Sequence, residues 1–303
     1  MSLDPDVINE IAIELGIDPA FVEKDWHSVQ VLKALAAHKS DDITTIFSGG
    51  TSLSKGHGLL QRFSEDLDFR CLYQNDHSNN QKKKLRSEYK ASIISTVQGI
   101  ELISLDQDTI QAASNYIKFP LIYPQDHPGH GSLRPHLEVE FSFTQPRLPP
   151  IKKQIQSFIS QFTNSEPETS ILCLSVVETG ADKLSALTWR VLKRNRTDEN
   201  DDPTMVRHLH DLSALKSILE TEKSVFVKTA NEAFEEDQKS KKRAIEQDFH
   251  CSMKNAFQLL KNDAEYQTEY SQFVDAMSYA DDEERIDFKG AMDSIEELIN
   301  YFS

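Results

Sequence analysis

The chain has 303 residues, of which 38% are hydrophobic and 27% are charged, so it is long enough to form a core without disulfides or a structural metal. Its net charge of −16, from 49 acidic and 33 basic residues, argues against broad, sequence-independent binding of nucleic acid, because that binding depends on phosphate neutralisation by Lys and Arg. A local basic groove, a bound cation or a basic protein partner is compatible with this charge.

The cysteines and the apolar runs indicate the compartment. Cys71, Cys173 and Cys251 lie far apart and form no C-x-x-C pair, which is typical of a reducing compartment and not of a zinc ribbon. The first residues show no basic stretch followed by an apolar one, as a signal peptide would. No apolar run approaches the ~18 residues that a membrane span requires. These features predict a cytoplasmic protein that does not bind a membrane.

The N-terminal half is predicted to alternate helices and strands. Asp4-Pro5 and Asp18-Pro19 each have the pattern of an N-cap followed by proline at the first helical position. The second of these helices is expected over residues 19–38. The further expected elements are strands over 43–47, 67–72, 102–105, 115–123 and 133–143, and helices over 51–60 and 78–98.

Residues 146–150, which include three prolines, mark a break in the pattern. A helix over 151–162 and a strand over 171–176 are expected next. From Glu178 onward the apolar residues follow helical spacing, interrupted by a polar linker at 197–203. The prediction is an α/β domain of α+β type over residues 1–176 and an all-helical domain over 177–303.

A Gly-Gly turn between a strand and a helix is the first candidate binding element. Glycine lets a backbone approach a ligand closely, and the N–H groups at a helix start attract anions. Hydroxyl and lysine side chains follow it and can donate to phosphate oxygens. An ordinary turn with a hydroxyl cap is the alternative, and the spacing is not that of a P-loop. The candidate phosphate-binding residues are Gly49, Gly50, Thr51, Ser52, Ser54 and Lys55.

Two strands carry acidic residues two positions apart. Asp66 and Asp68 then point to one side of their strand, where paired carboxylates suit Mg²⁺ or Mn²⁺. A solvent-facing strand with acids on its polar face is the alternative. Glu138 and Glu140 repeat the pattern, and one of them can be a third carboxylate if their strand neighbours that of Asp66. A surface strand is again the alternative.

One helix of the C-terminal half places basic residues on a single face. Lys183, Arg190 and Arg194 follow helical spacing and could clamp a triphosphate or a nucleic-acid strand. A solvated face with ion pairs is the alternative. Arg207 and Asp211 are one turn apart, which is compatible with an internal ion pair. A further basic run at 82–90 is a possible RNA contact or a solvated helix face.

Taken together, these residues resemble the AbiEii/AbiGii toxin family of nucleotidyltransferases, a branch of the DNA-polymerase-β-like superfamily. The resemblance lies in the string GGTSLSK…RFSEDLDF, with Glu140 in the place of the third acid. It extends to Val22-Glu23-Lys24-Asp25 and to the string KLSALTWR, which begins at Lys183. The Arg-Asp doublet that the family has in its next helix is Arg207-His208 here.

The resemblance implies a nucleotidyltransferase core, with a mixed sheet flanked by helices, that transfers NMP from an NTP to an acceptor hydroxyl. Some members of such families are toxins that modify the 3′ end of tRNA and are paired with an antitoxin; phage defence is the expected setting. The implied roles are phosphate binding by Gly49, Gly50 and Ser52, Mg²⁺ (or Mn²⁺) binding by Asp66, Asp68 and Glu140, triphosphate neutralisation by Lys183, and organisation of the helical lid or base pocket by Asp211.

Two other functions are compatible with the same motifs. Metal-dependent glycosyltransferases also use a D-x-D pair to hold a nucleotide-sugar diphosphate. A non-catalytic protein that binds a nucleotide or an antitoxin is the second. The Gly-Gly turn upstream and the acid on a later strand favour nucleotidyl transfer over glycosyl transfer. The presence of Asp66, Asp68, Glu140 and Lys183 argues against a protein that has lost turnover.

Overall fold

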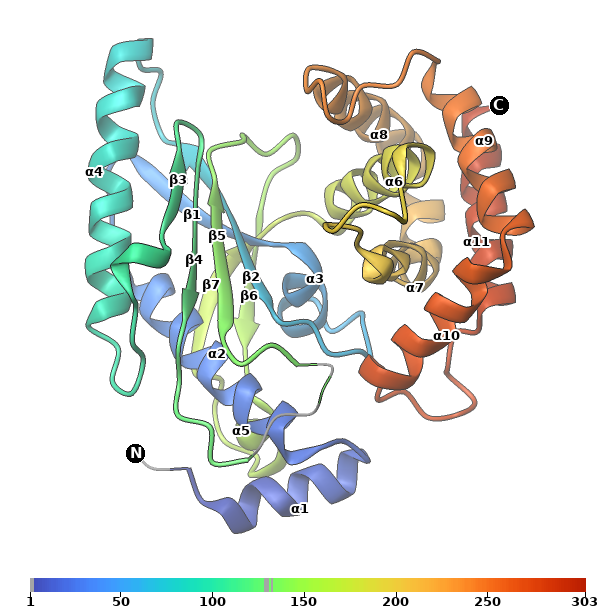
Figure 1. Ribbon diagram of the computed structural model, residues 1–303. Helices are drawn as coiled ribbons and strands as arrows, with labels where there is room; N and C mark the ends of the chain where they lie inside the picture. Colours follow the sequence, from blue (N-terminus) through green and yellow to red (C-terminus); the bar gives the residue numbers. More distant parts are fainter. Residues whose placement is uncertain (1–2, 128–130, 132) are drawn as a thin grey trace. The chain divides into compact units, whose positions relative to one another are not determined.

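The computed structural model describes residues 3–127, 131 and 133–303, and the chain divides into two compact units. The first unit comprises Met1–Gly58 and Phe63–Leu174 (Figure 1). The second comprises Ser175–Ser303 together with the short segment Leu59–Arg62. The strands and the candidate metal ligands belong to the first unit.

Among the described residues of the first unit, seven strands form one sheet in the order β3-β4-β5-β2-β1-β7-β6. The sheet is mixed, because β2 runs parallel to β5 and β1 runs parallel to β7, whereas the other neighbours are antiparallel. The strands are β1 Ile43–Ser48, β2 Asp66–Tyr73, β3 Gln111–Ala113, β4 Tyr116–Leu121, β5 Leu137–Ser142, β6 Ile151–Ile155 and β7 Thr169–Cys173.

Helices flank this sheet. The helices are α1 Pro5–Leu15, α2 Pro19–Ala37, α3 Gly49–Thr51, α4 Asn79–Gln98 and α5 Phe158–Phe162, with a π-helical turn η1 at Ser52–Gly56 and a 3-10 turn η2 at Gln107–Thr109. The N-caps Asp4 and Asp18 accept hydrogen bonds from Asp6 and Ala20, as their sequence pattern predicted. Helices α2 and α4 cover one face of the sheet (Figure 1), and their buried residues share its core.

The central strands have one apolar and one polar face. Leu67, Phe69 and Cys71 of β2 are buried, and they alternate with less buried polar residues. Strand β5 alternates in the same way, and the rings of Phe69 and Phe141 stack with centroids 4.7 Å apart. Because successive side chains of a strand point to opposite faces, the acidic residues lie on the face opposite this aromatic core. The two-residue repeat therefore fixes which side of the sheet carries the polar site.

Three expectations about local structure are wrong. The helix expected over 151–162 is helical in its second part alone, because Ile151–Ile155 pair with β7 as an edge strand, and sheet pairing outweighs their helix propensity. The strand expected over 102–105 is a single bridge from Ser104 to Ile122, because Leu102 has a φ of 64° and breaks the extended backbone. The helix expected over 51–60 ends at Gly56.

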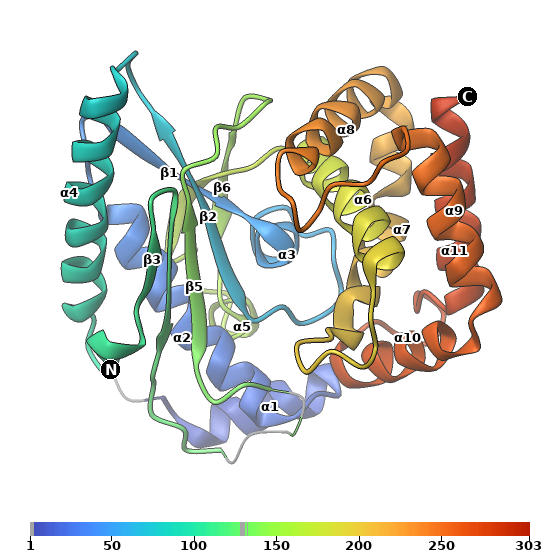
Figure 2. The same ribbon diagram turned by 45° about the horizontal axis from the view of Figure 1, so that its top comes forward.

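The second unit is helical. Helix α6 packs against α7, α8 and α9 (Figure 2). Residues 175–303, all of which are described, form no strand beyond one bridge between Ser278 and Arg62. The helices are α6 Val176–Lys193, α7 Arg207–Thr221, α8 Lys223–Gln238, α9 Phe249–Asn262, α10 Ala264–Met277 and α11 Phe288–Ile299, with 3-10 turns η3 at Pro203–Val206 and η4 at Asn300–Phe302. In the described part of the chain, no helix has the length and apolarity to cross a membrane.

The cysteines differ in exposure, which predicts their reactivity. Cys71 and Cys173 are buried, and Cys251 is exposed. Burial raises the pKa of both buried thiols, that of Cys173 to about 11, so neither supplies thiolate at neutral pH. We therefore expect a thiol reagent to modify Cys251 alone in the native protein, as mapped by mass spectrometry. A Cys251→Ser variant should react after denaturation only, and rapid native labelling of Cys71 or Cys173 would contradict this packing.

Candidate active site

The acidic residues of β2 and β5 form one array. The two strands are parallel neighbours, with Asp66 opposite Glu138 and Asp68 opposite Glu140. The adjacency on which a third carboxylate depended is thus confirmed. Because residues two apart share a face and register partners lie side by side, the four carboxylates are presented from the same polar face of the sheet.

The Gly-Gly turn is built against this array. Strand β1 ends at Ser48, which lies opposite Asp68, and the next residue, Gly49, has a φ of 76°. A Cβ at Gly49 would lie 2.2 Å from Oδ2 of Asp68, so the glycine allows the carboxylate to approach the backbone. Thr51 Oγ1 donates to the carbonyl of Asp66 at 2.5 Å. The turn and the aspartate strand are therefore locked together.

The remaining residues of the turn differ in their contacts. Ser54 donates to the carbonyl of Thr51 at 3.2 Å, and Gly50 and Ser52 are buried. Lys55 Nζ lies 2.5 Å from Oδ1 of the buried Asp25 and 3.7 Å from the ring centroid of Phe158. Burial raises the pKa of Asp25, and the Lys55 ammonium acts against that shift. The structure therefore uses Lys55 to neutralise a buried acid of α2.

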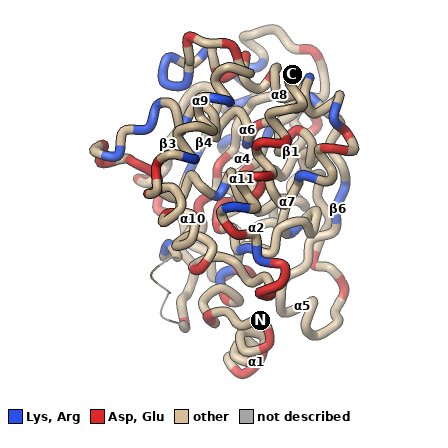
Figure 3. Tube along the Cα trace, turned by 90° about the vertical axis from the view of Figure 1, so that its right-hand side faces the viewer, with Lys and Arg blue, Asp and Glu red and all other residues tan. Residues whose placement is uncertain are grey.

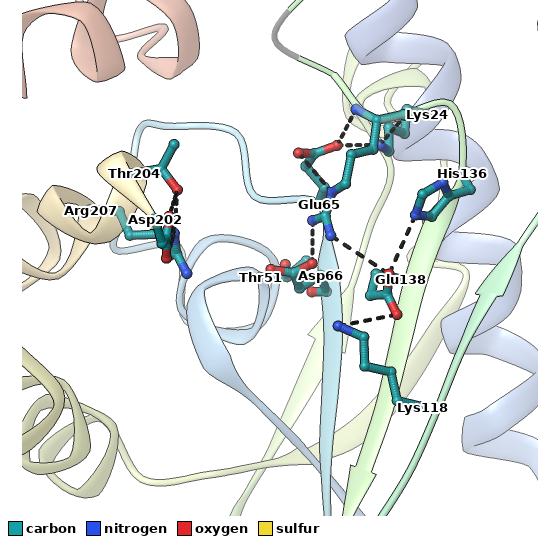
Figure 4. A network of polar contacts seen from close by, with 11 residues as sticks. Lys24, Thr51, Glu65, Asp66, Lys118, His136, Glu138, Asp202, Thr204 and Arg207 are labelled. Carbon is teal, nitrogen blue, oxygen red and sulfur yellow. Dashed lines mark hydrogen bonds and ion pairs between the residues drawn. The ribbon is translucent and has the colours of Figure 1, made fainter. Parts of the chain in front are cut away.

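Cationic side chains lie around Asp66 and Glu138, the first acidic residues of β2 and β5 (Figure 4). The Arg134 guanidinium contacts Asp66 through Nη2, and its Nη1 lies 3.8 Å from Oε2 of Glu138. Lys118 Nζ lies 3.4 Å from Oε1 of Glu138, and His136 Nε2 lies 3.3 Å from Oε2. Glu138 is thus engaged by three groups.

A buried charged run of α2 holds the loops around the site, and sequence reasoning gave it no role. Glu23 accepts from the backbone N–H of Asp126 at 2.9 Å, and Asp25 accepts from that of Phe158 at 2.8 Å. Lys24 Nζ is paired with Glu65 and donates to the carbonyl of Arg134 at 2.8 Å. Three consecutive charged residues within a buried helix were the available signal, because buried charges require partners.

The donor set of the array suits a hard divalent cation. Carboxylate oxygens on rigid strands are ligands that Mg²⁺ and Mn²⁺ accept. Within the residues that the structure describes, no three His, Cys, Asp or Glu side chains are already gathered as a ligand cage. Arg134 bridges two of the carboxylates instead, and it supplies the positive charge that the array requires. The residues that would hold an ion are Asp66, Asp68 and Glu140.

The second unit contains a separate buried ion cluster. Asp211 on α7 has no exposed surface, and its carboxylate accepts from Arg62 Nε and Nη2 at 2.6 Å each. Lys183 Nζ of α6 lies 2.6 Å from the same carboxylate. These cations hold the pKa of Asp211 well below its usual value, even though burial acts in the opposite direction. Lys183 and Asp211, which sequence reasoning singled out separately, therefore form one cluster with Arg62.

Three arginines of this unit are also paired. Arg190 Nη1 lies 3.2 Å from Asp202. Arg207 Nη1 contacts the same carboxylate at 3.2 Å (Figure 4). Arg194 pairs with Asp201 at 2.7 Å and with Glu269 at 2.6 Å. The basic face predicted for α6 thus carries ion pairs, and the linker at 197–203 supplies two of the acids.

A Gly49→Ala substitution tests the close approach of the turn to Asp68. The added Cβ would meet the Asp68 carboxylate, and φ would remain positive, so we expect a loss of about 2–3 kcal/mol in the free energy of unfolding and a large loss of activity. Gly58→Ala is the matched control, because Gly58 has a φ of 66° but nothing within 4 Å of an added Cβ. Equal thermal stability and equal activity of the two variants would contradict the argument.

Comparison with known proteins identifies a family and a fold. The profile of the family described as nucleotidyl transferase AbiEii toxin, type IV toxin–antitoxin system, matches residues 30–294. Among solved structures, MenT4, a nucleotidyltransferase toxin from Mycobacterium tuberculosis H37Rv, is similar in fold. The similarity covers 99% of each chain, with a TM-score of 0.57 and 15% sequence identity. No curated protein sequence matches the chain.

Proposed function

This chain belongs to the AbiEii family of nucleotidyltransferase toxins of type IV toxin–antitoxin systems, and we propose that it transfers NMP from an NTP to an RNA hydroxyl, that of the tRNA 3′ end, in a metal-dependent reaction. The observation that carries the proposal is the register of β2 with β5, which sets Asp68 beside Glu140 and next to Gly49. Family membership makes the chain a transferase and favours nucleotidyl transfer over the glycosyltransferase and non-catalytic alternatives.

The proposed reaction exchanges one bond at phosphorus for another. The acceptor oxygen forms a bond to the α-phosphorus, the bond from that phosphorus to the bridging oxygen breaks, and pyrophosphate leaves with the electron pair. Mg²⁺ or Mn²⁺, when bound, would neutralise charge on the phosphate oxygens. Asp66, Asp68 and Glu140 would hold the ion, and Glu140 would also accept the proton of the attacking hydroxyl.

The register of the two strands supports Glu140 as the third carboxylate. Glu138 lies opposite Asp66 and is engaged by Arg134, Lys118 and His136. Glu140 is the register partner of Asp68, the carboxylate against which Gly49 is built. Because both glutamates carry the same charge, a difference in transfer rate between Glu140→Gln and Glu138→Gln reports the position of the lost carboxylate and not the loss of charge.

Phosphate binding is assigned to the turn and to the basic residues of α6. Gly49 brings the backbone of the turn close to Asp68, and glycine admits a phosphate close to the backbone. Gly50 and Ser52 follow in the same turn and are proposed to bind phosphate with it. In the second unit, Lys183 and Arg190 are proposed to contribute positive charge to the triphosphate. Asp211, which forms an ion pair with Lys183, is proposed to organise the helical lid or the base pocket.

An RNA acceptor is compatible with the distribution of charged residues along this chain. Acidic and basic residues are interspersed along both units (Figure 3), so the charge of −16 is not confined to one segment. RNA binding to such a chain depends on local basic positions. Lys83 and Lys84 on α4 are exposed and are proposed as one such position. A cognate antitoxin is the partner that the family implies, and action in the cytoplasm, including phage defence, is proposed.

The test is incubation of the purified protein with Mg²⁺, bacterial tRNA and each of four α-³²P-labelled NTPs, resolved on a denaturing gel. A labelled tRNA band that depends on Mg²⁺ and is absent from an Asp66→Asn/Asp68→Asn double variant is the expected result. Label on protein instead of RNA would overturn the acceptor, and label that persists in EDTA would overturn the metal dependence.

A further inference from the structure

The side chain of Arg134 lies against Asp66 and Glu138, the first acidic residues of β2 and β5. We propose that Arg134 is a positioning residue that acts as a resident counter-cation: it holds Asp66 before metal binding and competes with a divalent ion for that carboxylate. Lys24 and Glu65 fix Arg134 in this place. The inference rests on the proposed metal-dependent function and assigns a role to three residues outside its ligand set.

The backbone of Arg134 is held on both sides. Its N–H donates to Oε2 of Glu65 at 2.9 Å, and its carbonyl accepts from Lys24 Nζ at 2.8 Å. Lys24 and Glu65 also pair with each other, and the Lys24 side chain has no exposed surface. A buried lysine with two oxygen partners is costly to rearrange, because an unpaired charge would be left in the interior. The backbone of Arg134 is therefore held in one position beside β2.

From this backbone position, the guanidinium of Arg134 reaches acidic side chains of both β2 and β5. Its Nη2 donates to Oδ1 of Asp66, its Nε donates to Oε1 of Glu65 at 3.4 Å, and its Nη1 lies 3.8 Å from Oε2 of Glu138. Asp66 and Glu138 are register partners on β2 and β5. Arg134 thus neutralises the first carboxylate of both strands at once, through forked donors that match carboxylate geometry.

Competition with a divalent ion follows from this contact. An ion that binds Asp66 through Oδ1 competes with the guanidinium for that oxygen, and an ion that binds through Oδ2 is repelled by the positive charge of Arg134 beside it. The guanidinium is charged at all physiological pH values, so it cannot leave by deprotonation. Removal of Arg134 should therefore strengthen metal binding, whereas removal of a residue that merely supports the fold would weaken it.

The experiment is a Mn²⁺ titration of the full-length protein without nucleotide, with free Mn²⁺ followed by its electron paramagnetic resonance signal. We expect Arg134→Gln to bind Mn²⁺ ~10-fold more tightly than wild type, since a hydrogen bond to a charged group is lost as a competitor. Arg134→Lys, which keeps the charge, should stay near the wild-type affinity. Lys118→Gln is the matched control, because Lys118 contacts Glu138 and loses one positive charge equally, and its affinity should change by less than about threefold.

The alternative outcomes separate the two proposals. Arg134→Gln with wild-type or weaker affinity would overturn the inference, as would equal tightening by Arg134→Gln and Lys118→Gln, which would show a net-charge effect. Wild-type protein that binds no more Mn²⁺ than the Asp66→Asn/Asp68→Asn double variant would overturn the metal role in the proposed function as well. Thermal unfolding of each variant tests whether that variant is folded. The Arg134 side chain is 38% exposed, so its replacement should leave the core intact.

Discussion

Asp66→Asn and Asp68→Asn should each lower the rate of nucleotidyl transfer by ~10³-fold or more, because each removes a charged ligand from the site at which phosphate charge is neutralised. Both residues lie on the polar face of β2, opposite the buried Leu67 and Phe69, so neither substitution opens a cavity in the core. Asn has nearly the same shape as Asp and still accepts hydrogen bonds, so the fold should persist. The measurement is a single-turnover transfer rate at saturating Mg²⁺.

Asp41→Asn is the control for these two variants. Asp41 is an exposed acid of the same unit, so its replacement changes the net charge by the same amount without touching the array. Its transfer rate should equal that of wild type. Retention of full activity by Asp66→Asn and Asp68→Asn would refute the metal-binding assignment, and a loss of folded signal in circular dichroism would instead show that the aspartates are structural.

Asp211→Ala should destabilise the helical unit by about 3–5 kcal/mol, the usual cost of breaking a buried ion pair by removing one partner. The substitution leaves Arg62 and Lys183, both nearly buried, without the carboxylate that they share. Arg62 lies in the short segment 59–62 that belongs to the second unit, so the loss would also loosen that segment. The measurement is the midpoint of unfolding in urea for wild type and variant.

Asp202→Ala is the matched control for this prediction. Asp202 also pairs with two arginines, but its side chain is 32% exposed, so solvent screens the interaction and the expected cost is about 0–1 kcal/mol. Equal destabilisation by the two variants would contradict the burial argument. A loss of activity in Asp211→Ala becomes evidence for a catalytic role only at temperatures at which that variant remains folded.

The pH dependence of the Asp211 contribution has a definite sign. The pKa of Asp211 is lower in the folded protein than its ordinary value of 3.8, because Arg62 and Lys183 stabilise the charged form. A carboxyl of this kind stabilises the fold at pH values above its unfolded pKa, and the contribution is lost as the pH falls toward the folded pKa. The stability difference between wild type and Asp211→Ala should therefore be constant from pH 8 to about 5 and shrink below about pH 4.

Local patterns in the sequence determined the part of the site that depends on a short repeat. The alternation of acidic and apolar residues in β2 and β5 follows from the two-residue period of a strand, so the face of each carboxylate could be read directly. The Gly-Gly turn, the proline-capped helices and the helical spacing of the C-terminal half are equally local. The all-helical second unit was predictable for this reason, whereas the mixed sheet was expected from the resemblance to the family.

Tertiary structure alone decided which distant residues meet. The pairing of β2 with β5, the contact of Arg134 with Asp66 across 68 residues and that of Arg62 with Asp211 across 149 residues have no local signature. The same holds for Lys55, which the sequence assigned to phosphate and which the fold pairs with Asp25. A buried charge takes whichever opposite charge the packed chain brings within reach, and that choice depends on the closure of the whole fold rather than on residue spacing.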